Sequence, residues 1–285
     1  MKKILLVTLL AIAALALVAC GASEKGKDDT GSGSGDAKEK TEDVKLVVGA
    51  SNTPHALILE EAKPLLKEKG IELVIEQYTD FIFPNQDLES GTLDANYFQH
   101  APYLNGQIAD HGYKFVNAGG IHIEPIGVYS KRFESVDELP NGAVILMSNS
   151  ITDHGRILAM LEIEGLITLD EGVEKTAAEV KDITDNPKNL VFEADYDPAL
   201  MPELYKQDEG DALLINSNFA IDAGLDPIKD SIVLEETDSP YANIIAVREG
   251  DEDKPEIKAL LEVLKSTEIQ DFILEEWNGS IIPVK

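Results

Sequence analysis

The chain has 285 residues, a formal net charge of −29 at pH 7 and one cysteine, Cys20. A surface this acidic repels nucleic acids and anionic lipid head groups, so neither is an expected partner. A single cysteine forms no intramolecular disulfide, and the rest of the chain has no thiol for a cysteine metal site or a thiolate nucleophile.

Residues 1–19 predict a signal peptide. Two lysines precede an apolar stretch at 4–16, which is shorter than the roughly 20 apolar residues of a membrane span. The tetrapeptide Leu17-Val18-Ala19-Cys20 resembles a bacterial lipobox, in which the cysteine is diacylated and becomes the first mature residue. We therefore expect a lipidated, palmitate-bearing Cys20 that holds the protein on the extracytoplasmic face of the cell membrane. An ordinary signal peptide with an incidental cysteine is the alternative.

Residues 20–43 predict a lipidated cysteine followed by a flexible linker, because residues 21–43 contain no large apolar side chain. The body at 44–285 offers no second apolar run of membrane-spanning length. It is long enough for two medium lobes or one large domain.

Short apolar strands alternate with amphipathic helices through the body, which predicts an α/β fold. Strands are expected at 44–50, 71–77, 95–97, 115–116, 126–129, 143–147, 190–193, 212–215 and 244–247. Helices are expected from Pro54 to Gly70, then at 87–90, 102–110, 153–164, 198–206, 219–223, 254–265 and 268–277.

Two extended segments marked by proline, at 124–126 and 239–242, are candidate crossings between two lobes. They divide the body into lobe one, 44–125 plus 243–285, and lobe two, 126–242. Ligands of open α/β sheets bind outside the carboxyl ends of the strands, so two facing lobes would form a cleft that hinges shut.

Catalysis has little support, since the chain contains no G-x-S-x-G, H-E-x-x-H or P-loop motif. We predict no catalytic residue and no cofactor. The five histidines are scattered, so no metal site is expected: His55, His100, His111, His122 and His154. A zinc or manganese receptor and an extracytoplasmic enzyme with His100 or His154 as its base remain alternatives.

Arg156 follows a polar turn at 149–155 that leads into a helix. A helix N-terminus and a guanidinium together favour a carboxylate, although a surface ion pair is the alternative. The densest aromatic stretch suits an apolar or thioether side chain, or else belongs to the core: Tyr78, Phe81, Phe83, Tyr97, Phe98 and Tyr103.

Several segments resemble the methionine-binding lipoproteins of the NlpA/MetQ type, the substrate receptors of methionine ABC importers. They include LDANYFQH at 93–100, HIEPIGVYS at 122–130, NPKNL at 186–190, INSNFA at 215–220 and DSPYANI at 238–244. The resemblance implies a type II periplasmic-binding-protein-like fold, with two lobes, two extended crossover segments and the ligand in the interlobe cleft.

The resemblance also implies the ligand contacts. Arg156 would hold the ligand carboxylate, with Asn149 and either Asn218 or Asn216. Four residues of lobe one would enclose the side chain, with Tyr241 near the hinge: Tyr78, Phe98, His100 and Tyr103.

The resemblance implies that the ligand, L-methionine or a close relative, is delivered to an ABC permease and its ATPase, and that the receptor is monomeric. The loop 148–156 reads SNSITDHGR here, whereas the family pattern is close to PNDPTNEGR. Asp153 would repel a ligand carboxylate unless it faces the ammonium or the solvent. A methionine-containing dipeptide, D-methionine and another amino acid therefore stay open as ligands.

Overall fold

The structure, a computed structural model, describes residues 43–236 and 240–284. The predicted signal peptide, the lipidation at Cys20 and the linker up to residue 42 lie outside the described residues, as do residues 237–239 of the second predicted crossing. Among the described residues, no helix combines the length and the apolar character needed to cross a bilayer.

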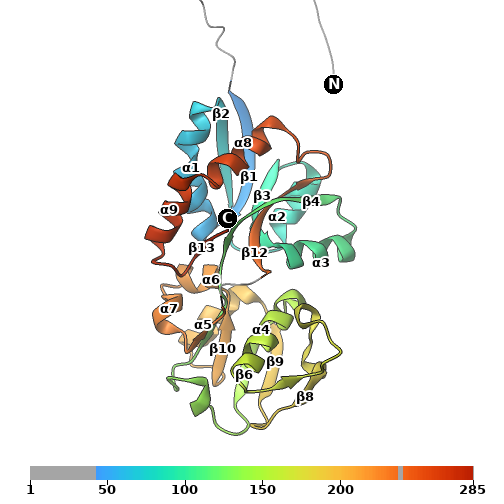
Figure 1. The fold of residues 1–285 in the computed structure, drawn as a ribbon, viewed down its shortest axis with the longest axis vertical. Helices are drawn as coiled ribbons and strands as arrows, with labels where there is room; N and C mark the ends of the chain where they lie inside the picture. The colour runs from blue at the N-terminus through green and yellow to red at the C-terminus, as the bar shows by residue number, and fades with distance from the viewer. Residues whose placement is uncertain (1–42, 237–239, 285) are drawn as a thin grey trace, which may run out of the picture. The chain divides into compact units, whose positions relative to one another are not determined.

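The first lobe is built on a six-stranded sheet with the order β13-β4-β12-β3-β1-β2 (Figure 1). Its strands are β1 Val44–Ser51, β2 Ile71–Tyr78, β3 Ala95–His100, β4 Phe115–Ile123, β12 Ala242–Arg248 and β13 Ile282–Pro283. Its helices are α1 Leu57–Glu68, α2 Phe83–Ser90, α3 Ala101–His111, α8 Pro255–Leu264 and α9 Thr267–Glu276. The strands β1, β2 and β3 run parallel, whereas β12 pairs antiparallel with both β3 and β4.

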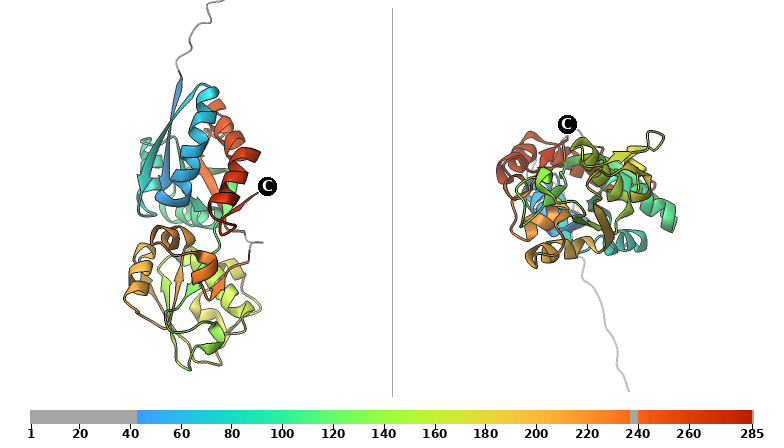
Figure 2. Two further views of the ribbon diagram at one scale, coloured as in Figure 1. Left: turned by 90° about the vertical axis from the view of Figure 1, so that its left-hand side faces the viewer. Right: turned by 90° about the horizontal axis from the view of Figure 1, so that it is seen from below.

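Helices α1, α8 and α9 lie side by side over one face of this sheet, as Figures 1 and 2 show from two directions. Leu46 and Val48 of β1 are fully buried beneath them, together with Leu59 of α1, Leu260 of α8 and Ile273 of α9. These side chains recur at alternate strand positions and on one helix face, so burial of their apolar surface joins the layers.

The second lobe is built on a five-stranded sheet with the order β11-β5-β10-β6-β9. Its strands are β5 Gly127–Tyr129, β6 Val144–Ser148, β9 Val191–Tyr196, β10 Ala212–Ile215 and β11 Val233–Leu234. Its helices are α4 Ile151–Ile163, α5 Met201–Lys206, α6 Ser217–Asp222 and α7 Pro227–Asp230, and β7 Thr168–Leu169 pairs with β8 Ile183–Asp185 beside them. Ile157 and Leu161 of α4 are buried with Ile145 and Met147 of β6.

The chain passes between the sheets twice, once after β4 and once between β11 and β12. The prediction of an α/β fold is therefore confirmed, with one lobe assembled from two separated parts of the chain.

The structure adds five short elements that were not predicted, namely β7, β8, β11, β13 and α7. It also differs from the predicted elements at three further places. Residues Asn52–Ala56 form a π-helical turn before α1, with Ser51 at the N-cap, so the predicted start at Pro54 is wrong. Helix α2 begins four residues early, because the Asp80 carboxylate accepts from the N–H groups of Ile82 and Phe83 at 2.7 and 2.8 Å. Strand β4 continues well beyond Val116, since its pairing with β12 proceeds through Gly119 and Gly120 by shifts in register.

Candidate functional site

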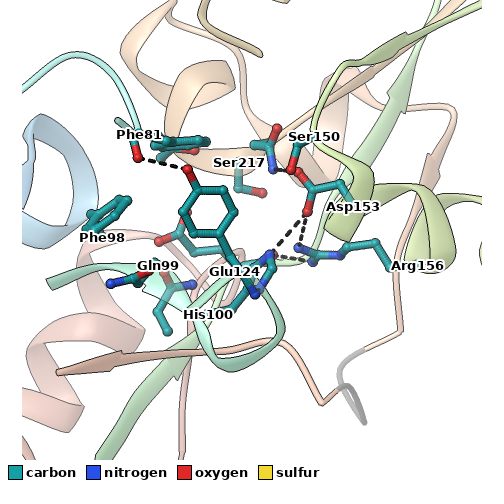
Figure 3. A pocket seen from close by; sticks show the side chains of 13 residues that line it. Phe81, Phe98, Gln99, His100, Glu124, Ser150, Asp153, Arg156 and Ser217 are labelled. Atoms are coloured by element: carbon teal, nitrogen blue, oxygen red, sulfur yellow. Dashed lines mark hydrogen bonds and ion pairs between the residues drawn. The ribbon is translucent and has the colours of Figure 1, made fainter. Parts of the chain in front are cut away.

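A pocket lies where the two lobes meet, and residues of both lobes and of the first crossing line it (Figure 3). Its lining residues are Phe81, Phe98, Gln99, His100, Tyr103, Glu124, Ser150, Asp153, Arg156, Asn216, Ser217, Asn218 and Asn243. Six of the nine predicted ligand contacts are among them: Phe98, His100, Tyr103, Arg156, Asn216 and Asn218.

The pocket is made mainly by three strand-to-helix turns. His100 ends β3 directly before α3, Ser150 lies between β6 and α4, and Asn216 lies between β10 and α6. The carboxyl ends of strands are where α/β sheets present ligand groups, because the chain turns there and exposes side chains and backbone N–H groups. The fold thus brings together residues that are more than 100 positions apart.

Aromatic rings form one side of the pocket. The ring centroid of Phe98 lies 6.0 Å from those of Phe81 and Tyr103, and Figure 3 shows Phe81 and Phe98 on the side away from Arg156. The Tyr103 hydroxyl donates to the backbone oxygen of Phe81 at 2.9 Å and so holds the loop before α2 against α3. Such a wall suits an apolar or thioether group.

Arg156 stands on the opposite side and is buried, so the alternative of a surface ion pair is wrong. Its Nε donates to Glu235 Oε1 at 3.2 Å, its Nη2 donates to Glu235 Oε2, and Nη2 also donates to the Glu124 carbonyl at 3.0 Å. The guanidinium carbon lies 4.5 Å from the ring centroid of Tyr241. These contacts fix the plane of the guanidinium, and Nη1 lies 3.7 Å from Oδ1 of Asp153, which lines the pocket.

Asp153 lies one helical turn before Arg156 and also lines the pocket. Its Oδ1 accepts from His100 Nε2 at 3.1 Å, and its Oδ2 accepts from Asn216 Nδ2 at 3.1 Å. Burial by itself would raise the pKa of Asp153, but the hydrogen bonds from His100 and Asn216 and the nearby Arg156 charge lower that pKa. A charged carboxylate therefore faces the pocket beside the guanidinium.

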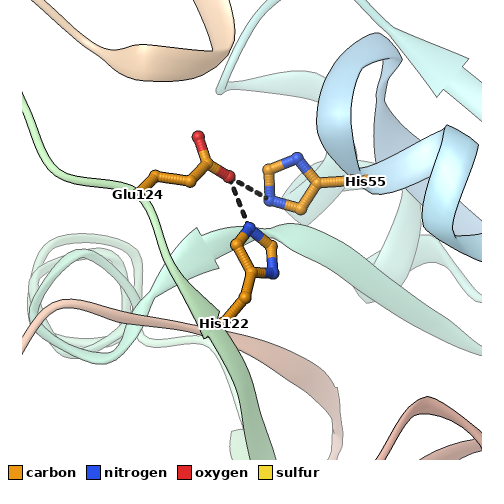
Figure 4. A group of neighbouring side chains, drawn as sticks. All are labelled: His55, His122 and Glu124. Carbon is orange, nitrogen blue, oxygen red and sulfur yellow. Dashed lines mark hydrogen bonds and ion pairs between the residues drawn. The ribbon is translucent and has the colours of Figure 1, made fainter. Parts of the chain in front are cut away.

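Two of the histidines predicted to be scattered come together with Glu124 behind the pocket (Figure 4). Glu124 Oε1 lies 2.7 Å from His122 Nε2 and 3.1 Å from His55 Nε2, while the Tyr97 hydroxyl hydrogen-bonds His122 Nδ1. The carboxylate oxygen thus occupies the position between the ring nitrogens where an ion would have to lie. The donor set matches zinc, but the arrangement fits a hydrogen-bonded network better.

Burial lowers the pKa of His55 to about 4 and that of His122 to about 3, and it raises the pKa of Glu124. Both rings are therefore neutral at pH 7. His122 Nε2 donates to the Glu124 carboxylate, and His55 Nε2, which also lies beside that carboxylate, donates to Asn243 Oδ1 at 3.0 Å. This network joins the first crossing to β4 and to the turn before α1.

Three predicted contacts lie outside the pocket lining. The Tyr78 hydroxyl donates to Asp87 Oδ2 at 2.5 Å, and its ring borders a different hollow. Asn149 lines an adjoining groove, with its backbone N–H bonded to the Tyr196 carbonyl at 2.7 Å. Tyr241 packs behind the pocket, where its ring centroid lies 5.0 Å from that of His100.

Seven lining residues are absent from the predicted contacts: Phe81, Gln99, Glu124, Ser150, Asp153, Ser217 and Asn243. Phe81 belongs to the aromatic stretch, and Gln99, Glu124, Ser217 and Asn243 lie inside the quoted motifs, so a reading of whole motifs would have included them. Neither Asp153 nor Ser150 belongs to those motifs.

The family model described as NlpA lipoprotein matches residues 46–285. The methionine-binding lipoprotein MetQ of Bacillus subtilis (strain 168) is 48% identical over 289 residues, which cover 100% of this chain and 99% of the relative. A nutrient binding protein from Burkholderia cenocepacia, solved bound to methionine, is 40% identical with a TM-score of 0.80, covering 84% of this chain and 100% of that one.

A periplasmic substrate-binding protein of an ABC transporter from Coxiella burnetii is 35% identical with a TM-score of 0.79, and the match covers 84% of this chain and 100% of that one. The two structural matches extend over both lobes. They confirm the prediction of a two-lobed fold like that of type II periplasmic binding proteins.

Proposed function

The chain belongs to the NlpA lipoprotein family, and from this premise we propose that it captures L-methionine and delivers it to an ABC importer. The observation that carries the proposal is the two-sided pocket, with the buried Arg156 on one side and the rings of Phe81, Phe98 and Tyr103 on the other. Methionine has a carboxylate and an ammonium at one end and a thioether at the other, so its chemistry matches both sides.

In this proposal the ligand carboxylate lies near Arg156 Nη1 and the amide of Asn218, both of which reach the pocket. The thioether lies among the aromatic rings, where sulfur–aromatic contacts are worth about 0.3–1.5 kcal/mol each. His100 and Asn216 hold the Asp153 carboxylate in place through their hydrogen bonds to it. Tyr241 acts by supporting the guanidinium, and Asn149 by shaping the adjoining groove, while Tyr78 braces the wall through Asp87.

The two parts of the fold support lobe boundaries at 44–125 plus 243–285 and at 126–242, since the strands of each sheet fall within these ranges to one residue. We propose that Cys20 carries the lipid anchor and that a monomer works on the extracytoplasmic face of the membrane. The permease and ATPase of an importer are the proposed protein partners. The relatives named as lipoproteins and transporter components support this assignment.

The relatives are binding proteins, which favours a receptor over an enzyme. D-methionine, a methionine dipeptide and another amino acid remain candidate ligands within the same fold. A thermal-shift screen of the twenty amino acids, D-methionine and short methionine peptides ranks them. The absence of a shift with every compound would contradict the transport proposal.

Replacing Arg156 by alanine tests the carboxylate contact. Calorimetry should detect L-methionine binding to the wild-type protein and none to Arg156→Ala, because the ligand carboxylate then lacks its charged donor and the buried carboxylates of Asp153 and Glu235 lose their counter-charge. Arg132→Ala is the matched control, since Arg132 is an exposed arginine that pairs with Asp208 and Asp211 far from the pocket. Equal affinities of wild type and Arg156→Ala would sink the assignment.

A further inference from the structure

The polar side of the pocket carries more negative than positive charge. Asp153 and Glu235 share the single guanidinium of Arg156: Nε lies 3.2 Å from Glu235 Oε1, and Nη1 lies 3.7 Å from Asp153 Oδ1. Glu235 has the closer, two-pronged contact, so it takes most of the Arg156 charge. Asp153 is the one of the two carboxylates that lines the pocket, and the unbalanced negative charge is therefore at the pocket surface.

His100 does not supply the missing positive charge. The backbone N–H of Tyr103 donates to His100 Nδ1 at 3.0 Å, so that nitrogen must carry a lone pair. The ring hydrogen therefore sits on Nε2, where it is donated to Asp153 Oδ1 at 3.1 Å. The two hydrogen bonds thus fix a neutral imidazole beside the carboxylate. Figure 3 shows the His100 and Asp153 side chains facing each other.

Asn216 provides a second, independent indication of what the pocket lacks. Its Nδ2 donates to Asp153 Oδ2 at 3.1 Å, an orientation that the carboxylate imposes because two oxygens would repel each other. Its Oδ1 is buried, and among the described residues no group donates to it. A buried acceptor without a donor destabilises the protein, and a ligand donor would satisfy it.

A charged carboxylate and an unsatisfied amide oxygen at one end of a pocket call for a cationic group with several hydrogens. Glu124 adds a second carboxyl group to the lining, although its Oε1 already accepts from His122. A primary ammonium has three donors and one positive charge, so it satisfies Asp153 and Asn216 together. A carboxylate placed there would face Asp153 at short range.

We propose that Asp153 makes this pocket select its ligand by the α-ammonium group more strongly than by the α-carboxylate. The inference rests on the proposed methionine function and narrows it to a ligand class, primary amines with a thioether side chain. This class includes methionine and also methionine whose carboxyl group is blocked as an amide. N-terminal methionyl compounds therefore fall within its range, and compounds without the amine do not.

Two near-isosteric probes separate the contributions of the two charged groups. L-Methioninamide removes the negative charge of the carboxylate, and 2-hydroxy-4-(methylthio)butanoate replaces the ammonium by a hydroxyl group. Wild-type protein should bind the amide with an affinity within about tenfold of that for L-methionine. It should bind the hydroxy acid at least about 100-fold more weakly than L-methionine, which is the usual effect of losing one charge-assisted contact. Calorimetric competition against L-methionine measures all three affinities.

Asp153→Asn keeps the shape of the side chain and removes its charge. In this variant the ratio of hydroxy-acid affinity to amide affinity should rise by about 100-fold. Asp110→Asn is the control, because Asp110 is an exposed acidic residue of the adjoining groove, and its ratio should match the wild type. Unfolding temperatures verify that both variants fold.

Wild-type protein that binds L-methionine but rejects the amide would overturn this inference and leave the proposed function standing. An unchanged ratio in Asp153→Asn would overturn it as well. Wild-type protein that binds none of the three compounds would overturn both the inference and the proposed function.

Discussion

Glu124 connects the binding pocket to a fully buried pair of histidines, and this connection has a consequence for stability. His55 and His122 are held neutral because burial disfavours their charged forms, which lowers the pKa of His55 to about 4 and that of His122 to about 3. In the unfolded chain both titrate near pH 6.5. Below about pH 6.5 the two histidines therefore bind more protons in the unfolded state than in the folded state.

The expected result is a loss of stability as pH falls from 6.5 towards 4. Between pH 7 and pH 5 each histidine should lower the free energy of unfolding by about 2 kcal/mol, because a unit of pKa difference is worth about 1.36 kcal/mol. The raised pKa of Glu124 acts in the opposite direction at lower pH, since the folded state then holds that proton. Urea unfolding at both pH values measures the difference.

His122→Gln isolates one of the two contributions. The drop in unfolding free energy between pH 7 and pH 5 should be smaller by about 2 kcal/mol in this variant than in the wild type. His111→Gln is the control, since His111 is exposed, and its drop should equal that of the wild type. Identical drops in all three proteins would show that the buried ring does not control the acid response.

For individual residues, the sequence predicts which side chains line the pocket better than it predicts which residues they contact. Arg156, Phe98 and His100 were identified because each belongs to a recognisable local pattern. The partner of Arg156 is Glu235, 79 residues later, and the partner of His55 is Asn243, 188 residues later. Acidic side chains are abundant in this chain, so no local pattern distinguishes Glu235 from its neighbours before the sheets are assembled.

Among the elements, helix α4 controls the position of both Asp153 and Arg156. Gly155 lies between them, and a Cβ atom at that position would lie 2.5 Å from the backbone oxygen of Lys175 and 2.6 Å from that of Thr176. The helix can therefore approach the short turn Lys175–Ala177 only without a side chain there. The glycine serves close packing, because its φ angle is an ordinary helical one.

Gly155→Ala should lower the free energy of unfolding by about 1–3 kcal/mol, the usual cost of overpacking against backbone. It should also weaken L-methionine binding, since the helix must move. Gly172→Ala is the control, because the nearest atom to its Cβ belongs to the side chain of Asp170 at 3.2 Å, which can give way. Urea unfolding measures the first effect and calorimetry the second. A Gly155→Ala variant with the stability and affinity of the wild type would contradict the close packing.

Most helices and strands follow from hydrophobic spacing, and two of the exceptions share one cause. Strand β4 passes through Gly119 and Gly120, which carry no strand signal of their own, and its extent is set by pairing with β12. Helix α2 begins at Phe83, where the Asp80 carboxylate accepts from the N–H groups of Ile82 and Phe83. In both places hydrogen bonding to a neighbouring group sets where the element begins or ends, and the local propensity of the residues does not.

At the scale of the whole molecule, the described arrangement brings α3 of the first lobe against α4 of the second. A Cβ atom on Gly106 would lie 3.1 Å from Thr152 Cγ2 across the groove beside the pocket. A larger side chain on this face of α3 does not fit while the lobes are this close. Binding proteins of this fold class enclose ligands by domain closure, so the contact should matter in the bound state.

Gly106→Leu should weaken L-methionine binding at least about tenfold, while the ligand-free protein keeps or gains stability because leucine favours a helix over glycine by nearly 1 kcal/mol. Ala109→Leu adds the same side chain at an exposed position of α3 and serves as the control. Calorimetry and urea unfolding provide the two measurements. Wild-type affinity in Gly106→Leu would show that the two helices do not approach during binding.

The position of β12 sets the order in which the molecule can be completed during synthesis. This strand lies between β3 and β4 in the first sheet, yet it is made after the whole second lobe. Residues 127–234 can therefore form their sheet as the chain leaves the ribosome. The first sheet stays incomplete until β12 is made, because β3 and β4 have no strand between them. The pocket becomes a binding site only when residues 242–285 have been added to the first lobe.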